Sequence, residues 1–393
     1  MGYQGWRSFM SCALALSAVV LVAGCGSQSG TAEPTGSADV PALDPARIQK
    51  FDLGKYDAVR MTAAGIVTIT GDGLNGYDPR TGKQRWTIRR DGAQVDQQSI
   101  WLLDSGHVLL VGWKNVPERI AYDTDSGREL WPTMNPSWSE ADVVAGNFVR
   151  NDPRTGQRSW SIDPATVGCA VPLPDKPTLF ESRDVLLFRC PSKVGNDNDM
   201  RDLRIGALAK DTGKVLWQRQ LEGDQSIARG PSNVLDVRLG DKADTVDVRT
   251  GAVLGTRKRP DSPWRYPLPD GSALAMDSVN LVEDKEFRLV AADGTVKWTA
   301  PLQAGEQTLP GPAAQNVVLG TMRQRQGDPK ATWILAWDLR TAKRTVILGP
   351  DTTAQNESPS LRFPVAVDTP LEVWPWGVAV KGTDGSFAVI PAA

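Results

Sequence analysis

Histidine is nearly absent from this chain of 393 residues, in which His107 is the only one. Metal sites in proteins often use several histidines, and a Ser-His-Asp triad needs one as its base. The composition therefore argues against a histidine-based metal centre, and a triad would have to use His107 alone. Because His107 directly precedes an apolar run at 108–111, we expect it to be structural and not catalytic.

A strong net charge is also lacking. The 44 Lys and Arg residues nearly balance the 46 Asp and Glu residues, which gives a net charge of −2. No broad basic field is available for nucleic acid, so we expect no nucleic-acid partner. With 40% hydrophobic and 23% charged residues, the chain has the composition of a globular protein with a sizeable core. No amphipathic helical pattern follows residue 45, whereas 37 glycines and 28 prolines indicate many turns.

The first 25 residues have the pattern of an export signal. Arg7 is followed by a mostly apolar stretch at 9–23, which suits a signal sequence and is short for a membrane span. The stretch ends in Leu21-Val22-Ala23-Gly24-Cys25, which resembles the lipobox of bacterial lipoproteins. In that family the cysteine thiol takes a diacylglycerol and becomes the first residue of the mature chain, and the resemblance gives this role to Cys25. The alternatives are a plain secretory signal cleaved near Ala23 and an uncleaved anchor.

Residues 26–45 contain few large apolar side chains and no periodic pattern. This composition is typical of a flexible tether. We therefore divide the chain into a lipoprotein signal peptide at 1–25, a flexible linker at 26–45 and a folded domain at 46–393. The domain would be held at the extracytoplasmic side of the cell membrane by the Cys25 lipid.

The four cysteines have three different fates in this interpretation. Cys12 leaves with the signal and Cys25 takes the lipid, so Cys169 and Cys190 remain as an even pair in an exported domain. Such pairs commonly form disulfides outside the cytoplasm. Both lie in sequences typical of strands, and a bridge would close a loop of about 20 residues, worth about 3 kcal/mol in the chain-entropy model. Two buried free thiols are the alternative, and the lack of Cys-x-x-Cys spacing argues against a redox-active pair.

The rest of the chain repeats one unit, in which a strand is followed by a turn of the type Asp-x-x-Thr-Gly and a short strand that often carries Trp. The turns recur at intervals of 38 to 48 residues, at positions 82, 127, 168, 213, 251, 294, 342 and 385. This spacing is typical of four-stranded propeller blades. We predict an all-β fold, a β-propeller with eight four-stranded blades, and seven as the alternative because the copy around 168 is irregular. A further turn at 151–156 falls off the period and is interpreted as an inner hairpin of the third blade.

Each part of the unit has a physical role. The turn Asp can bond backbone N–H groups two residues later, and the Gly takes the positive φ that closes the hairpin. A Trp on the outer strand can wedge against the neighbouring blade. We expect this structural role for four equivalent residues: Trp86, Trp131, Trp217 and Trp298.

The sequence Asp-Pro-x-Thr-Gly-Lys-x-x-Trp resembles the propeller repeat of the pyrroloquinoline-quinone type, most specifically at Tyr77–Trp86 and Ala209–Trp217. The resemblance covers residues 58–393 and implies a ring of blades, which Ile48–Tyr56 would close by pairing with Phe387–Ile390. Quinoprotein dehydrogenases of this type are longer and carry a vicinal Cys-Cys disulfide beside the cofactor. This chain has no Cys-Cys, so we expect no enzyme, no cofactor, no metal site and no catalytic residues.

Other motifs have simple structural interpretations. Gly71–Gly76 fits G-x-G-x-x-G, but a hairpin follows it and not the helix that dinucleotide binding requires. The acidic loop Gly195–Asp199 lacks the pattern of an EF-hand, and the basic run Arg257–Arg259 suits a solvated connection, with anionic lipid contact as the lesser option. Three Trp residues lie outside the outer-strand register, and either blade packing or contact with a partner or sugar would account for them: Trp138, Trp374 and Trp376.

These features favour a membrane-anchored, non-enzymatic scaffold or assembly factor that binds a protein partner as a monomer. Resemblance at the level of the fold includes propeller lipoproteins that assist outer-membrane protein assembly. The composition together with the lipobox also resembles lipoproteins of actinobacterial envelopes. A ligand-binding sensor or solute receptor that uses the propeller funnel is the alternative, and a hydrolase or lyase with paired carboxylates in the channel is the third possibility.

Overall fold

The computed structural model describes residues 41–135, 138–170, 178–181, 185–192, 203–221, 226–229, 234–258, 264–268, 272–276, 286–291, 294–301, 306–324, 331–350, 359–366 and 371–393. Within these ranges the only helices are three short 3-10 helices, η1 (Pro45–Arg47), η2 (Asp104–Gly106) and η3 (Pro164–Val167). All other regular structure is β-strand, which confirms the all-β prediction.

The described strands form eight sheets, which we number in chain order. The strands of the first four, from the innermost outward, are as follows: sheet 1, β2 (Ala58–Thr62), β3 (Gly65–Thr70), β4 (Gly73–Tyr77) and β5 (Gln84–Arg89); sheet 2, β6 (Gln94–Leu103), β7 (Val108–Lys114), β8 (Val116–Asp123) and β9 (Glu129–Thr133); sheet 3, β10 (Ala141–Val144), β11 (Asn147–Asn151) and β12 (Arg158–Ile162); sheet 4, β13 (Thr178–Glu181), β14 (Val185–Pro191), β15 (Leu203–Ala209) and β16 (Val215–Gln220).

The remaining sheets continue the pattern. Their strands are as follows: sheet 5, β17 (Ser226–Arg229), β18 (Val234–Leu239), β19 (Lys242–Asp247) and β20 (Val253–Lys258); sheet 6, β21 (Trp264–Pro267), β22 (Ala273–Met276), β23 (Glu286–Val290) and β24 (Val296–Pro301); sheet 7, β25 (Glu306–Ala313), β26 (Val317–Gln324), β27 (Thr332–Asp338), β28 (Arg344–Gly349) and the parallel addition β29 (Leu361–Arg362); sheet 8, β30 (Gly377–Lys381), β31 (Phe387–Pro391) and β1 (Gln49–Phe51).

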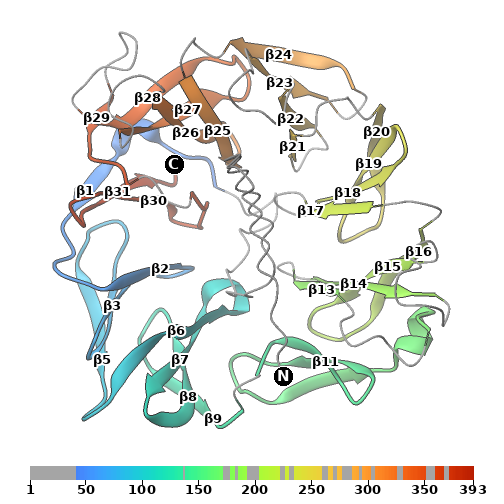
Figure 1. Cartoon of the computed structure of the whole chain (residues 1–393), viewed down its shortest axis with the longest axis horizontal. Coiled ribbons are helices and arrows are strands. Elements are labelled where there is room, and N and C mark those ends of the chain that lie inside the picture. Colours follow the sequence, from blue (N-terminus) through green and yellow to red (C-terminus); the bar gives the residue numbers. More distant parts are fainter. Residues whose placement is uncertain are drawn as a thin grey trace, which may run out of the picture.

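The sheets stand around one centre in chain order, and sheet 8 lies between sheets 7 and 1 (Figure 1). The ring is closed by the N-terminal strand, since β1 pairs antiparallel with β31 through Gln49 and Val389, Lys50 and Ala388, and Phe51 and Phe387. This pairing confirms the predicted closure. The folded region begins earlier than predicted, however, because Leu43 is buried and forms a bridge with Ala392, so residues 41–45 are not flexible linker.

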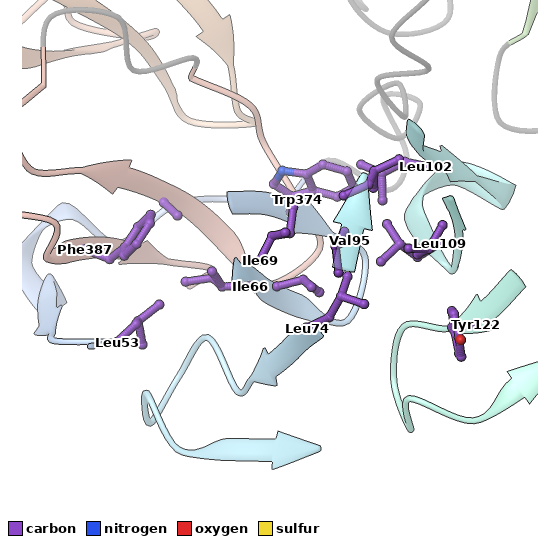
Figure 2. Close-up of a cluster of buried hydrophobic side chains, with 14 of the residues drawn as sticks. Leu53, Ile66, Ile69, Leu74, Val95, Leu102, Leu109, Tyr122, Trp374 and Phe387 are labelled. Carbon is purple, nitrogen blue, oxygen red and sulfur yellow. The ribbon is translucent and has the colours of Figure 1, made fainter. Parts of the chain in front are cut away.

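The core lies between neighbouring sheets, because each sheet buries apolar side chains on both faces. One cluster joins sheets 8, 1 and 2: Phe387 lies on one side of Ile66, Ile69 and Leu74, and Leu109 lies on the other (Figure 2). β3 and β7 are almost wholly buried, as their near-continuous apolar sequences require. Trp374 and Trp376 are also buried, and Trp376 Nε1 donates to the Thr62 carbonyl at 2.9 Å, so blade packing accounts for both.

The repeated turns have the chemistry that the sequence predicts. Asp78 Oδ1 accepts backbone hydrogen bonds from Arg80 and Thr81 at 2.7 and 3.0 Å, and Gly82 has a φ of +66°. Asp338 makes the same contacts in sheet 7, where hydrogen bonds led by the Thr341 hydroxyl lower the pKa of its carboxyl. The first of these turns joins β4 to β5 and the second joins β27 to β28, so each turn sets where the strand after it begins.

One of the eight predicted turn positions is wrong, and another, at 385, is a turn that joins a different pair of strands. The segment around 168 is not a hairpin but η3, with Gly168 ending the helix, whereas the turn at 152–157 joins β11 to β12 and is the true turn of sheet 3. The turn at 385 joins β30 to β31, one strand earlier than in the other sheets, because the outer strand of sheet 8 comes from the N-terminus.

The Trp side chains of the outer strands dock on the next sheet, as predicted. Trp86 packs against Gly127, and its Nε1 donates to the Thr124 carbonyl at 3.1 Å. Trp131, Trp217 and Trp298 make the same hydrogen bond. In each case the acceptor is the backbone carbonyl of the second residue of the next turn: Pro153, Val248 and Leu339. Trp160 makes it as well, to the Lys210 carbonyl at 3.0 Å. Trp160 was not among the four predicted residues, because it follows the turn that was assigned to an inner hairpin.

Candidate functional site

A hollow lies beside sheet 3, where the repeat departs most from its pattern. Sheet 3 has three described strands, and the segment that leads from β9 into it includes residues 134–140. The hollow has a volume of about 490 Å³ and is lined by Asn135, Trp138, Ser139, Asp142, Val144, Asn151, Gly156 and Arg158. This volume falls within the range of small-molecule sites.

Trp138 is the aromatic member of the lining and is held from several directions. Its ring lies 4.8 Å from that of Trp131, the residue that docks sheet 2 on sheet 3. Trp138 Nε1 donates to the Gly156 carbonyl at 3.4 Å, and its backbone N–H donates to the Asn135 carbonyl. The indole ring of Trp138 is therefore fixed at the junction between sheets 2 and 3. It still lines the hollow, where it offers a rigid apolar surface.

The polar members of the lining come from β10, β11 and β12 and from the segment between β9 and β10, which contains Asn135 and Ser139. Asp142 and Val144 lie two residues apart on β10, so both face the same side of sheet 3. Asn151 ends β11, where its Nδ2 donates to the Ser139 carbonyl at 2.8 Å, and Arg158 begins β12. An amide, a carboxylate and a guanidinium, with many hydrogen-bonding positions among them, thus surround one indole ring.

A buried charged cluster fixes the segment next to the hollow. Glu140 follows Ser139 directly, and its Oε1 lies 3.7 Å from both Arg150 Nη2 and Lys210 Nζ. All three side chains are buried, and a buried carboxylate is tolerated only where cations accompany it. The backbone of Glu140 also accepts a hydrogen bond from Asn151 N–H. The cluster therefore holds the residue just before β10 against β11 and sheet 4.

Exposed large apolar side chains gather in two places among the described residues. Met134 and Val144 belong to the surroundings of the hollow. The others begin the outer strands of three consecutive sheets, and we call them the apolar rim: Val215, Leu216, Val253, Leu254 and Val296. The same two positions are mostly polar elsewhere, as in Gln84-Arg85, Arg158-Ser159 and Arg344-Thr345. The rim therefore departs from its own repeat, which argues that it has a use beyond packing.

The predicted site residues are distributed as follows. Cys25, the predicted lipid acceptor, lies outside the described residues. Cys169 and Cys190 form a disulfide, with their Cα atoms 5.6 Å apart. Cys169 is not in a strand, contrary to the prediction, because it follows Gly168 at the end of η3, whereas Cys190 lies in β14. The bridge therefore ties the connection after sheet 3 to a central strand of sheet 4.

The remaining motifs are structural or lie outside the described residues. Gly71–Gly76 contains the turn after β3 and most of β4, and the hairpin of β4 and β5 follows it, as predicted. His107 is exposed, at the end of η2. The loop Gly195–Asp199 lies outside the described residues, as does Arg259, and of Arg257 and Lys258 the structure describes only the backbone, in β20.

Two further observations are limited to the described part of the chain. It holds no group of three His, Cys, Asp or Glu side chains close enough to bind a metal ion. None of its helices has the length and apolar character that a membrane crossing needs.

The sequence contained one unused signal for the hollow. Only 29 residues separate Gly127 from Gly156, the turn glycines of sheets 2 and 3, whereas the interval is 45 between Gly82 and Gly127. So short an interval cannot hold four strands of ordinary length with their connections. A short blade at this place, with Trp138 inside it, was therefore open to prediction.

Sheets that repeat around one centre, joined by docked Trp rings and closed by a terminal strand, define a β-propeller. The family model described as outer membrane protein assembly factor BamB matches residues 70–300, more than half of the chain, and the chain belongs to this family.

Two solved structures with similar folds are WD40 domains. That of SCAP from fission yeast has 8% sequence identity and a TM-score of 0.46, and the C-terminal WD40 domain of Sif2 has 9% identity and a TM-score of 0.44. Each match covers 88% of this chain and 98% of the other chain. No curated protein matches the chain in sequence.

Proposed function

We propose that this protein is a membrane-anchored, extracytoplasmic lipoprotein whose propeller is a non-enzymatic scaffold or assembly factor for a protein partner. The observation that carries the proposal is the family match over residues 70–300, because the family is described as an assembly factor. The lipobox ending at Cys25 supports the anchor and the location. The eight sheets support a ring of eight blades, in which sheets 3 and 8 each have three described strands.

The apolar rim is the surface we assign to the partner. Exposed Val and Leu residues on three consecutive outer strands would lose water-exposed apolar area when a protein covers them. Lys214 and Lys297 are exposed beside Val215 and Val296, so the partner surface would carry apolar side chains with acidic residues around them. A surface that spans several blades also suits the area that stable protein interfaces bury.

The test is crosslinking of the native membrane-anchored protein, followed by purification and mass spectrometry. One variant carries Leu216→Glu and Leu254→Glu, and its matched control carries Ser159→Glu and Thr345→Glu at the equivalent, exposed positions of sheets 3 and 7. We expect one reproducible protein partner that the control retains, that the rim variant loses, and that Cys25→Ala loses through release from the membrane. Retention of the partner by the rim variant would remove the rim from the proposal, and the absence of any partner would contradict the scaffold function.

A further inference from the structure

The hollow beside sheet 3 combines three features. It holds an aromatic ring fixed by a neighbouring ring, several planar polar side chains, and exposed apolar side chains nearby. It also lies where the interval between successive turns is shortest, beside a sheet with three described strands. From this combination we infer that the hollow is a saccharide-binding site, with Trp138 as its platform.

The chemistry of the lining selects the ligand class. A sugar ring has an apolar face of C–H groups, which can lie on the indole of Trp138, and an edge of hydroxyl groups that both donate and accept hydrogen bonds. Asp142 accepts, Arg158 donates, and the amides of Asn135 and Asn151 have both kinds of group. A wholly apolar ligand would displace water from the exposed Asp142 carboxylate and Arg158 guanidinium and would replace none of that water's hydrogen bonds, which is costly.

The charges of the lining favour a neutral saccharide. Asp142 and Arg158 bring one negative and one positive group to the same hollow. A phosphate or carboxylate ligand would gain from Arg158 but would be repelled by Asp142, whereas hydroxyl groups can bond to both. The volume of about 490 Å³ suits a few sugar units.

Trp138 and its surroundings are built to stay in place without a ligand. The ring packs on Trp131, its N–H is bonded to Gly156, and the Glu140 cluster fixes the adjoining backbone. A preformed platform reduces the ordering cost of binding, so a shallow site of this kind can reach dissociation constants in the range of about 0.1–10 mM for an oligosaccharide.

The test uses fluorine NMR on the purified protein labelled with 5-fluorotryptophan. The probes are two neutral, soluble oligosaccharides, the β-1,4-linked tetramers of glucose and of N-acetylglucosamine. The Trp138 resonance is identified as the one missing from Trp138→Phe. We expect at least one probe to shift this resonance in a saturable way, and we expect Asp142→Ala and Arg158→Ala each to weaken binding by roughly tenfold.

Matched controls separate binding from folding. Asp91→Ala and Arg128→Ala remove the same side-chain types at exposed positions in other sheets, and they should leave the affinity unchanged. The well-spread Trp spectrum of each variant shows whether it is folded. The inference is overturned if neither probe shifts the Trp138 resonance of the folded protein at about 20 mM, well above the expected range. It is equally overturned if Asp142→Ala and Arg158→Ala bind as the parent does.

Discussion

The seam between sheets 1 and 2 and the seam between sheets 5 and 6 are built from the same repeat, yet only one holds a docked ring. At the first seam Trp86 packs on Gly127 and donates to Thr124. At the second, Gly255 occupies the Trp position, and no described atom lies within 4 Å of a Cβ placed on the turn residue Gly294. The φ of Gly294 is nevertheless +91°. The turn therefore favours glycine for its backbone conformation, and close approach of a ring is a separate, additional use of the same residue.

The comparison also distinguishes two runs of three sheets by surface chemistry. Where the outer strands of sheets 1 to 3 begin with mostly polar residues, Arg85 reaches across the seam and pairs with Asp125 of the next turn. Sheets 4 to 6 have apolar residues at the same places. The outer strand is thus constrained at its Trp position and free to vary beside it, which is where a binding surface can evolve without loss of the fold.

The largest expected effect comes from removing a docked ring. Trp131 is buried, bonds to Pro153 and supports Trp138, so Trp131→Ala leaves a cavity at the seam of sheets 2 and 3. We expect the free energy of unfolding to fall by about 3–5 kcal/mol. Trp131→Phe keeps most of the packing and loses the hydrogen bond, so its loss should be smaller. Chemical denaturation of both variants checks this, and equal losses would contradict the docking role.

The next prediction concerns the disulfide that reinforces one junction between sheets. Sheets 3 and 4 are joined both by Trp160 and by the Cys169–Cys190 disulfide. Replacing both cysteines by Ala should lower the free energy of unfolding by about 3 kcal/mol, because the unfolded chain gains freedom over a loop of about 20 residues. Denaturation with and without reductant supplies the measurement. Reductant should destabilise the parent and leave the double variant unchanged, and an effect on both would assign the loss to another cause.

The repeat was predictable from sequence because its signals are local. In a turn of this type an Asp accepts the backbone N–H two residues later, and a Gly of positive φ follows. This pattern depends on only a few neighbouring residues, and most of the turns were predicted from it. The closing strand was also predictable, because Ile48–Tyr56 supplies a strand where the last blade needs one.

The errors arose where the same local chemistry serves two structures. Asp163 accepts the N–H of Ala165, and Gly168 has a φ of +73°, as at a blade turn, yet here these residues begin and end η3. Only the pairing of β11 with β12 across the sheet shows that 152–157 is the true turn. Predicting the hollow requires still more long-range information. Trp138, Asp142 and Arg158 come from three elements, and the packing of two sheets brings them together. The sequence showed only that Trp138 was out of register and that the interval between the turn glycines around it was short.

A smaller effect sharpens the comparison of the two seams directly. In Gly127→Ala the new Cβ would lie 2.8 Å from the Trp86 ring, in addition to the strain of a positive φ, whereas Gly294→Ala meets only the strain. We expect losses of about 2–4 kcal/mol and about 1 kcal/mol respectively. Ala342 already has a φ of +58° at the equivalent place in sheet 7, so Ala342→Gly should stabilise by about 1 kcal/mol. Equal losses for the two glycine variants would show that ring contact is unimportant.

The smallest effect concerns the turn aspartates and acid. Hydrogen bonds led by that of the Thr341 hydroxyl lower the pKa of Asp338 in the folded protein. At the equivalent place in sheet 2, burial raises the pKa of Asp123, but bonds from Ser126 and the Asp125 N–H, with the charge of Arg154, outweigh it and lower the pKa overall. A lowered pKa gives stability that is present above the unfolded value, near 4, and lost as the pH falls through the folded value. Asp338→Asn keeps an acceptor oxygen and cannot titrate, so its free energy of unfolding should approach that of the parent as the pH falls below about 4. A constant difference between the two from pH 7 to pH 3 would show that the charge of Asp338 contributes nothing to the turn.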